Sequence, residues 1–343
     1  PAWGRFLATA LGTLGALAGA LYGVLLVVDP YDTLWFSPPL ARAPVTTNQR
    51  FAFPALARKA RFDSAVIGTS TTRLLRPSDL DRSLGGAFVN LSMNSGTAWE
   101  QARILEVFAK AHPRARTVLF GIDAVWCAQG ERYEKFTPRP FPEWMYDDNR
   151  WNDLLHLFNF STLQQVGRQL GHLTGLRPSD YGSDGYTNFL PDATRYDIAR
   201  ARAHIYGRPE ARPIPPRDAV ALDALVRSRT WAFPAHPLFG EMLAGLAPAT
   251  RKVLMFVPYH LYSQRAGGPE DMARWAACKA ALTRQALNHA NVHVLDFMID
   301  SAITADDASY WDALHYSTAI AERLAVLIAQ GVAEGRGAPG LFD

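Results

Sequence analysis

Three side chains in the sequence have the types and spacing that nucleophilic catalysis requires. Ser70 closes the tripeptide Gly68-Thr69-Ser70 after an apolar stretch, and Asp312 precedes His315 by three residues near the end of the sequence. An aspartate at that spacing can hold the imidazole Nδ1, which leaves Nε2 to accept a proton from a serine hydroxyl. Each half also has a purely structural explanation, because serine at a strand–helix turn and aspartate before a helix are both common N-caps.

The elements around these residues are expected to bring them together. Five apolar segments have the composition of strands buried on both faces, namely residues 64–70, 87–93, 117–123, 252–258 and 292–298. Helical patterns alternate with them over residues 98–111, 269–290 and 318–333. This alternation predicts a three-layer α/β/α domain with a parallel sheet. Functional residues in such sheets lie beyond the carboxyl ends of the strands, so Ser70 and His315 are expected at one edge.

Residues 127–250 interrupt the alternation of strands and helices. They contain most of the prolines and many aromatic residues. We interpret them as a large insertion after the third strand, which forms either a wall of the site or an accessory subdomain that only packs. Its aromatic side chains would stack on sugar rings in the first case and fill a core in the second. The predicted organisation is an anchor over residues 1–35, the α/β domain over residues 36–335 and a C-terminal tail over residues 336–343.

The N-terminal segment predicts a membrane anchor. Residues 6–28 form a run of 23 residues without a charge, long enough to cross a hydrocarbon core of roughly 30 Å. A cleavable signal peptide has a shorter apolar region of about 7–15 residues. Arg5 precedes the run and Asp29 and Asp32 follow it, which predicts a cytoplasmic N-terminus and a body outside the cytoplasm.

A stripe of small residues recurs within this apolar run. Gly15, Gly19 and Gly23 are spaced every fourth residue. Such a stripe either packs against a partner helix or reflects the general frequency of glycine in membrane helices.

Composition and missing motifs exclude several classes of protein. The net charge is +3 and the basic residues are scattered singly, so a nucleic-acid partner is not expected. The sequence has no phosphate-binding glycine loop, no H-E-x-x-H and no C-x-x-C, and neither a metal nor an organic cofactor is expected.

Three further residues have two possible roles each. Cys127 and Cys278 either form one disulfide or remain two buried thiols. His260, after the fourth strand, either lines the crevice or makes a local hydrogen bond.

The serine and D-x-x-H blocks together resemble the SGNH (GDSL-like) hydrolase superfamily over residues 64–333, without the insertion. The resemblance implies a flavodoxin-like domain in which Ser70 is the nucleophile, His315 the general base and Asp312 its orienting acid. It also implies that Gly96, two residues after Asn94, offers an oxyanion-hole amide.

One position departs from the family pattern. The family has asparagine after the third strand, whereas this sequence has Asp123. A carboxylate would oppose an oxyanion, where a hydrogen-bond donor is wanted. Either Asp123 is protonated, or it has another task such as pairing with Arg73.

The anchored architecture is similar to members of the superfamily that assist polysaccharide O-acylation in bacteria, such as alginate acetylation and teichoic-acid D-alanylation. This likeness implies an O-acyltransferase, most simply of acetyl groups, that modifies a cell-surface or secreted polysaccharide through an acyl-serine. The acyl donor would arrive through a multi-pass membrane acyltransferase. Two alternatives remain: an esterase or deacetylase that uses water, and a non-catalytic SGNH-like scaffold in a membrane acylation or export complex.

Overall fold

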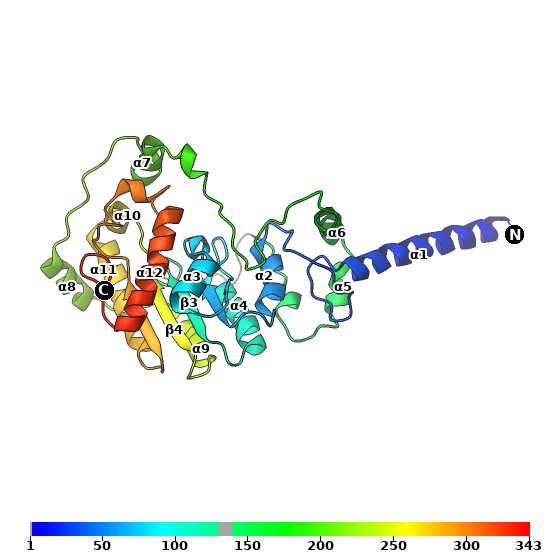
Figure 1. The fold of residues 1–343 in the computed structure, drawn as a ribbon, viewed down its shortest axis with the longest axis horizontal. Coiled ribbons are helices and arrows are strands. Elements are labelled where there is room, and N and C mark those ends of the chain that lie inside the picture. The colour runs from blue at the N-terminus through cyan, green and yellow to red at the C-terminus, as the bar shows by residue number, and fades with distance from the viewer. Residues whose placement is uncertain (1, 130–138) are drawn as a thin grey trace. The chain divides into compact units, whose positions relative to one another are not determined.

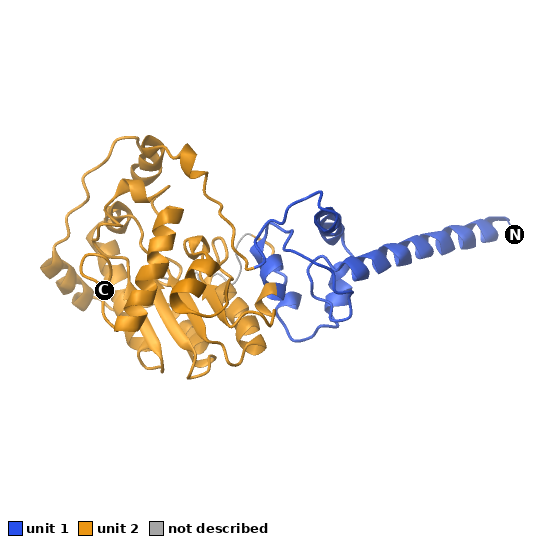
Figure 2. Ribbon diagram, viewed as in Figure 1, with its two compact units in different colours: residues 1–55, 141–183 blue, residues 56–140, 184–343 orange. Residues whose placement is uncertain are grey.

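The computed structural model describes residues 2–129 and 139–343, which form two compact units (Figure 2). Unit 1 consists of residues 1–55 and 141–183, and unit 2 of residues 56–140 and 184–343. These boundaries differ from the predicted ones. The anchor does not stand alone, because residues up to 55 and part of the insertion pack with it.

A five-stranded parallel sheet forms the centre of unit 2, in the order β2-β1-β3-β4-β5. This is the flavodoxin-like strand order. Strands β3 and β4 of the sheet are labelled in Figure 1. The strands are β1 (Ser64–Ile67), β2 (Phe88–Asn90), β3 (Thr117–Ile122), β4 (Arg251–Phe256) and β5 (Val292–Asp296). The parallel sheet and mixed α/β class are therefore confirmed, and each strand lies within about one residue of its predicted start. β1 ends three residues early, because the chain turns away from the sheet at Gly68.

The helices of the described residues divide between the units. Unit 1 holds α1 (Ala2–Val28), most of α2 (Gln49–Ala57), α5 (Asp153–Leu157) and α6 (Phe160–Leu173). Unit 2 holds α3 (Pro77–Leu84), α4 (Ala98–Ala111), α7 (Ile198–Tyr206), α8 (Ala219–Ser228), α9 (His236–Ala244), α10 (Leu261–Ala266), α11 (Gly268–Ala286) and α12 (Thr318–Glu334).

Two helical layers cover the sheet of unit 2. α3 and α12 contact one another, and α4, α9 and α11 form a second contacting set. Right-handed crossovers place these two sets on opposite faces of a sheet with this strand order. α4 matches its predicted range because Thr97 and Glu100 form a capping box at its start and Pro113 follows its end. The predicted helix over residues 269–290 is α11, with the separate α10 before it.

Unit 1 begins with α1, and polar side chains close its last turn. Arg42 donates to the carbonyls of Val28 and Val27, at 2.7 and 3.0 Å. A cation at this position satisfies orphan carbonyls and complements the helix dipole. Asp29 is fully buried and accepts from the amides of Thr33 and Leu34. The chain therefore turns tightly away from the end of α1.

The C-terminal residues, predicted as a tail, pack against the sheet. Phe342 is fully buried, and Asp343 exchanges two backbone hydrogen bonds with Asp296 of β5. Residues 338–343 thus close the exposed edge of the sheet, where unpaired strand groups would otherwise meet solvent.

Candidate active site

Ser70, His315 and Asp312 form a continuous hydrogen-bonded chain. His315 Nε2 lies 2.8 Å from Ser70 Oγ, and His315 Nδ1 lies 2.7 Å from Asp312 Oδ2. Ser70 follows β1, whereas the other two residues lie in the loop between β5 and α12. The predicted geometry is confirmed, and it is that of a Ser-His-Asp triad.

Two glycines create the turn that presents Ser70. A Cβ on Gly68 would lie 2.2 Å from Thr72 Oγ1, and a Cβ on Gly121 of β3 would lie 2.2 Å from Thr72 Cγ2. The buried Thr72 side chain therefore occupies space that only two glycines leave open. This packing folds residues 68–72 tightly over the end of the sheet and keeps Ser70 partly exposed.

The same turn is tied to β2 and to the histidine loop. Asn90, the last residue of β2, donates from Nδ2 to the carbonyls of Thr72 and Leu75, both at 2.9 Å. Tyr316 donates its hydroxyl to the Thr71 carbonyl at 2.7 Å, which joins the residue after His315 directly to the serine turn. Sequence reasoning missed both anchors. The position of Tyr316 beside the D-x-x-H block was the available signal.

Asp312 has both of the roles that the sequence allowed. Its Oδ1 accepts from the amides of Leu314 and His315, each at 2.8 Å, as a local cap does. Its Oδ2 holds the His315 ring. Partial burial opposes ionisation of Asp312, but the hydrogen bonds and charge of His315 and the two amides outweigh it and lower its pKa. An ionised Asp312 favours an imidazolium at His315 during proton transfer.

Asp123 lies beneath the serine turn and holds it in place. Its Oδ2 accepts from Thr69 Oγ1, and its Oδ1 accepts from the Val125 amide at 3.2 Å. Burial raises the pKa of Asp123 to about 6, although these two hydrogen bonds favour the ionised form. Within the described residues Asp123 forms no ion pair with Arg73. Of the alternatives for Asp123, the pair with Arg73 is not formed among the described residues, and the carboxylate instead positions the residue before the nucleophile.

Two of the residues expected beside an oxyanion, Gly96 and Arg73, are engaged in other contacts. The Gly96 amide donates to the Met93 carbonyl at 3.0 Å, so it is engaged in a turn in this conformation. Arg73, which is 4% exposed, donates instead to Asn94 Oδ1. Within the described residues the Ser70 amide donates no hydrogen bond, which leaves it available to an oxyanion.

One residue of the insertion reaches the site. The edge of the Phe189 ring meets His315, with 5.4 Å between ring centroids, and the Arg73 guanidinium lies over the same ring at 4.7 Å. A ring in this place shields one side of the imidazole, and its face holds the Arg73 guanidinium nearby through a cation–π contact. Part of the insertion therefore forms a wall of the site, while residues 141–183 belong to unit 1. No local sequence signal distinguishes Phe189 from the other aromatics.

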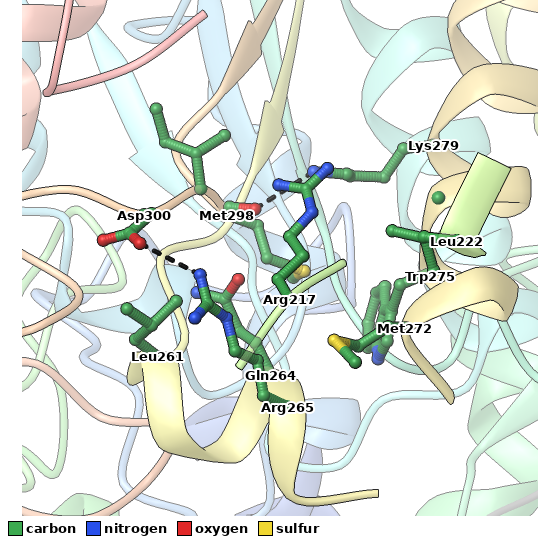
Figure 3. Close-up of a pocket in the computed structure, with 12 residues that line it drawn as sticks. Arg217, Leu222, Leu261, Gln264, Arg265, Met272, Trp275, Lys279, Met298 and Asp300 are labelled. Carbon is green, nitrogen blue, oxygen red and sulfur yellow. Dashed lines mark hydrogen bonds and ion pairs between the residues drawn. The ribbon is translucent and has the colours of Figure 1, made fainter. Parts of the chain in front are cut away.

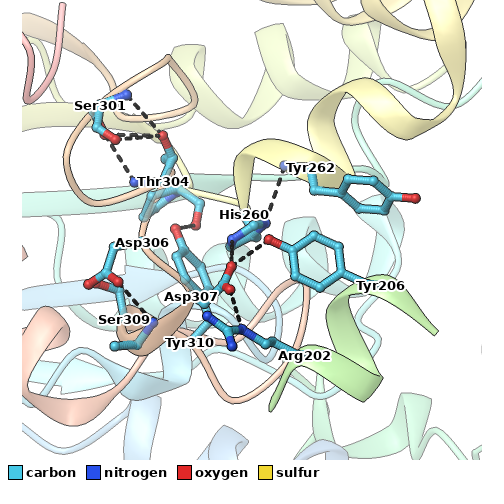
Figure 4. A network of polar contacts seen from close by, with 12 residues as sticks. Arg202, Tyr206, His260, Tyr262, Ser301, Thr304, Asp306, Asp307, Ser309 and Tyr310 are labelled. Atoms are coloured by element: carbon cyan, nitrogen blue, oxygen red, sulfur yellow. Dashed lines mark hydrogen bonds and ion pairs between the residues drawn. The ribbon is translucent and has the colours of Figure 1, made fainter. Parts of the chain in front are cut away.

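A second, buried histidine–aspartate pair supports the loop that carries Asp312 (Figure 4). His260 is fully buried, its Nε2 lies 3.1 Å from Asp307 Oδ1, and its amide donates to the Ala313 carbonyl at 3.0 Å. Arg202 and Tyr206 of α7 also bind the Asp307 carboxylate. Burial lowers the pKa of His260 despite the nearby carboxylate. His260 is thus a structural residue with a long-range partner.

Other features of unit 2 lie outside this site. A cavity of about 70 Å³ lies between α8, α10, α11 and the segment after β5, with an Arg265–Asp300 ion pair at its rim (Figure 3). Small-molecule pockets are typically ~300–1,000 Å³, and no triad residue lines this one.

Cys127 and Cys278 form a disulfide, with 5.5 Å between Cα atoms, so of the two alternatives left open by the sequence the disulfide is the one present. Within the described ranges, no three His, Cys, Asp or Glu side chains cluster as metal ligands.

In comparisons with known proteins, no family model and no curated sequence matches this chain. Its chemistry must therefore be argued from the geometry of the triad and from the residues around it.

Proposed function

We propose that this protein is a membrane-anchored, SGNH-like serine O-acyltransferase that works on the extracytoplasmic side of a bacterial inner membrane. In this proposal it transfers an acyl group, most simply acetyl, to a hydroxyl of a cell-surface or secreted polysaccharide. The supporting observation is the hydrogen-bonded chain from Ser70 through His315 to Asp312 at the carboxyl edge of the sheet. A scaffold would not need these two hydrogen bonds together.

The triad accounts for both half-reactions. Ser70 Oγ attacks the acyl carbonyl of the donor while its proton passes to His315 Nε2. The tetrahedral intermediate then expels the donor's leaving group, which takes that proton, and acyl-Ser70 remains. An acceptor hydroxyl next gives its proton to Nε2 and attacks the ester carbonyl. Ser70 is released when His315 returns the proton to Oγ, while Asp312 stabilises the imidazolium in each half.

The developing oxyanion needs donors, and Ser70 supplies the first from its own amide. The Gly96 amide serves as a second donor if it exchanges the Met93 carbonyl for the substrate oxygen. Arg73 binds Asn94 and lies over the Phe189 ring, which meets His315, so its positive charge lies close to the triad. These residues form the substrate-binding set in the proposal, and Asp123 is assigned to positioning.

The location is supported by two independent features. α1 is long and apolar enough to cross a membrane, and only 11% of its most apolar 18 residues are buried, unlike a core helix. The Cys127–Cys278 disulfide fits an oxidising compartment such as the periplasm.

The glycine stripe of α1 is open. Within the described residues nothing lies within 4 Å of a Cβ built on Gly15, Gly19 or Gly23. The part of this stripe at Gly15 is available to a multi-pass membrane acyltransferase that would supply the acyl group.

Hydrolysis is the second candidate, and one observation favours it. The side chains of Asp312 and His315 are 36% and 18% exposed, so water reaches the triad. A water molecule in place of the sugar hydroxyl would make the protein an esterase or deacetylase with the same acyl-serine step.

The test uses the full chain and a fluorophosphonate probe, which labels activated serines. We expect labelling of the wild type and none of Ser70→Ala. Ser317→Ala is the matched control, because Ser317 caps α12 two residues after His315 and its loss costs only about 1 kcal/mol. An unlabelled wild type, or equal labelling of Ser70→Ala, would overturn the covalent mechanism. Mass spectrometry of a polysaccharide oligomer incubated with an acetyl ester donor then separates transfer, which acetylates the oligomer, from hydrolysis, which does not.

A further inference from the structure

Unit 1 exposes a group of large apolar side chains beside the membrane-crossing helix. We call this group the apolar collar; its members are Trp35, Phe36, Trp151, Leu155, Phe158 and Phe160, with exposures of 65%, 43%, 64%, 83%, 52% and 75%. A soluble surface rarely concentrates so many large apolar side chains, because each costs free energy in water. An apolar partner is therefore expected to cover the collar.

The collar is attached to α1 well before that helix ends. Tyr22 of α1 donates its hydroxyl to the Leu154 carbonyl at 2.8 Å, and its ring meets Phe158 with 5.9 Å between centroids. Ala18 and Gly19 join Tyr22, Leu154, Leu155 and Phe158 around an open hollow of about 370 Å³. α5 and α6 lie beside the C-terminal part of α1 in Figure 1, and α6 contacts α1 directly. Leu155 and Phe158 of the collar thus lie along the apolar helix.

Helix geometry gives the depth of this contact. A hydrocarbon core of roughly 30 Å takes about 20 residues at about 1.5 Å each. If Arg5 marks one boundary, the other falls near Leu25. Tyr22 and Ala18 then lie about 4.5 and 10.5 Å inside that second boundary. Interfacial helices are typically buried by about 5–10 Å, so the collar lies at their usual depth.

Some polar groups of the segment have partners within it. Asn159 satisfies the chain locally, because its Oδ1 accepts from the Thr162 amide and its Nδ2 donates to the His156 carbonyl. Asp153 is 1% exposed and pairs with Arg150 at 3.4 Å. Backbone and charged groups must be satisfied internally where water is scarce. Trp35 and Trp151 meet edge to face, and tryptophan is enriched at membrane interfaces.

We propose that the apolar collar inserts into the outer leaflet of the bilayer that α1 crosses, with a lipid acyl chain in the hollow formed by α1 and residues 154–158. The inference rests on the proposed membrane anchoring of α1. The collar continues the lipid-facing surface of α1, which commits it to lipid and not to a second protein.

Site-directed spin labelling of the full chain in lipid nanodiscs tests the proposal. Single cysteines carry the label at three positions: Leu155→Cys in the collar, Leu14→Cys in the middle of α1, and Val220→Cys in α8. Val220 is the matched control, since it is 80% exposed and belongs to unit 2. Labelling without reductant leaves the Cys127–Cys278 disulfide intact.

The measured quantity is the ratio of the label's collision rate with oxygen to its collision rate with a water-soluble nickel chelate. We expect this ratio to be several-fold higher at positions 155 and 14 than at position 220. If the ratio is high at position 14 but the same at position 155 as at position 220, the collar proposal is overturned while the membrane anchor stands. If position 14 is also water-exposed, the anchor itself fails, and with it the collar. A photo-crosslinker placed by Phe158→Bpa (p-benzoylphenylalanine) in cells supplies the last arm. Adducts to lipid support the proposal, whereas a discrete protein adduct would reassign the collar to a membrane protein partner.

Discussion

Replacing Asp123 by asparagine should make unit 2 more stable, and the gain should depend on pH. Asp123 is 3% exposed, and burial raises its pKa from 3.8 to about 6. Asparagine keeps the shape and the two contacts, because its oxygen can accept from the Val125 amide and its nitrogen can donate to Thr69 Oγ1. The substitution therefore removes the buried charge and leaves the local hydrogen bonding close to that of the native residue.

The sign and size follow from linkage. Below about pH 4 the carboxyl of Asp123 is neutral in both the folded and the unfolded chain, so the charge costs nothing. Between about pH 4 and 6 the unfolded chain loses this proton before the folded chain does, so wild-type stability falls as pH rises. Above pH 6 the folded chain carries the full cost of the buried charge, at most about 3 kcal/mol for a pKa displaced from 3.8 to about 6. The Asp123→Asn variant escapes this loss.

Urea unfolding of the full chain in detergent at pH 4 to 8 measures the difference. Hydrogen exchange of the β1 and β3 peptides reports on unit 2 alone. The free energy of unfolding of Asp123→Asn should match that of the wild type near pH 4 and exceed it increasingly up to about pH 7. Asp223→Asn, which removes an exposed carboxylate from α8, is the control for losing one negative charge. A difference that is independent of pH, or largest at pH 4, would refute the argument that burial raises the Asp123 pKa.

Three further outcomes are expected. Removing the disulfide by Cys127→Ser with Cys278→Ser should lower the free energy of unfolding by at most about 5 kcal/mol, because the disulfide closes a loop of 151 residues. Thermal melting with and without reductant checks this. Asp307→Asn should weaken the His260 contact that supports the Asp312 loop, lowering stability by about 1–3 kcal/mol and slowing serine labelling by the fluorophosphonate; unchanged labelling would contradict the positioning role. Phe189→Ala should reduce the labelling rate by about tenfold or less while the melting temperature stays near the wild-type value, because the ring is 36% exposed and contacts His315 and Arg73.

The sequence alone determined the elements whose signals are local. The strands of unit 2 are apolar on both faces because helices cover both sides of the sheet, and this composition is visible without a structure. α4 was predicted at its observed bounds because its capping residues and Pro113 are neighbours of the helix. The pairing of Ser70 with His315 was also predictable, because parallel strands bring their carboxyl ends to one edge.

Tertiary structure alone decided everything that depends on contacts between distant segments. Residues 141–183 pack with the N-terminal 55 residues, although no composition shift within the insertion marks that division. Asp123 binds Thr69 and not Arg73, and Phe189 is selected from many aromatics to contact His315. A side chain carries no local record of which distant partner it will meet. That choice is made only when the packed chain brings the partners within a few ångströms of one another.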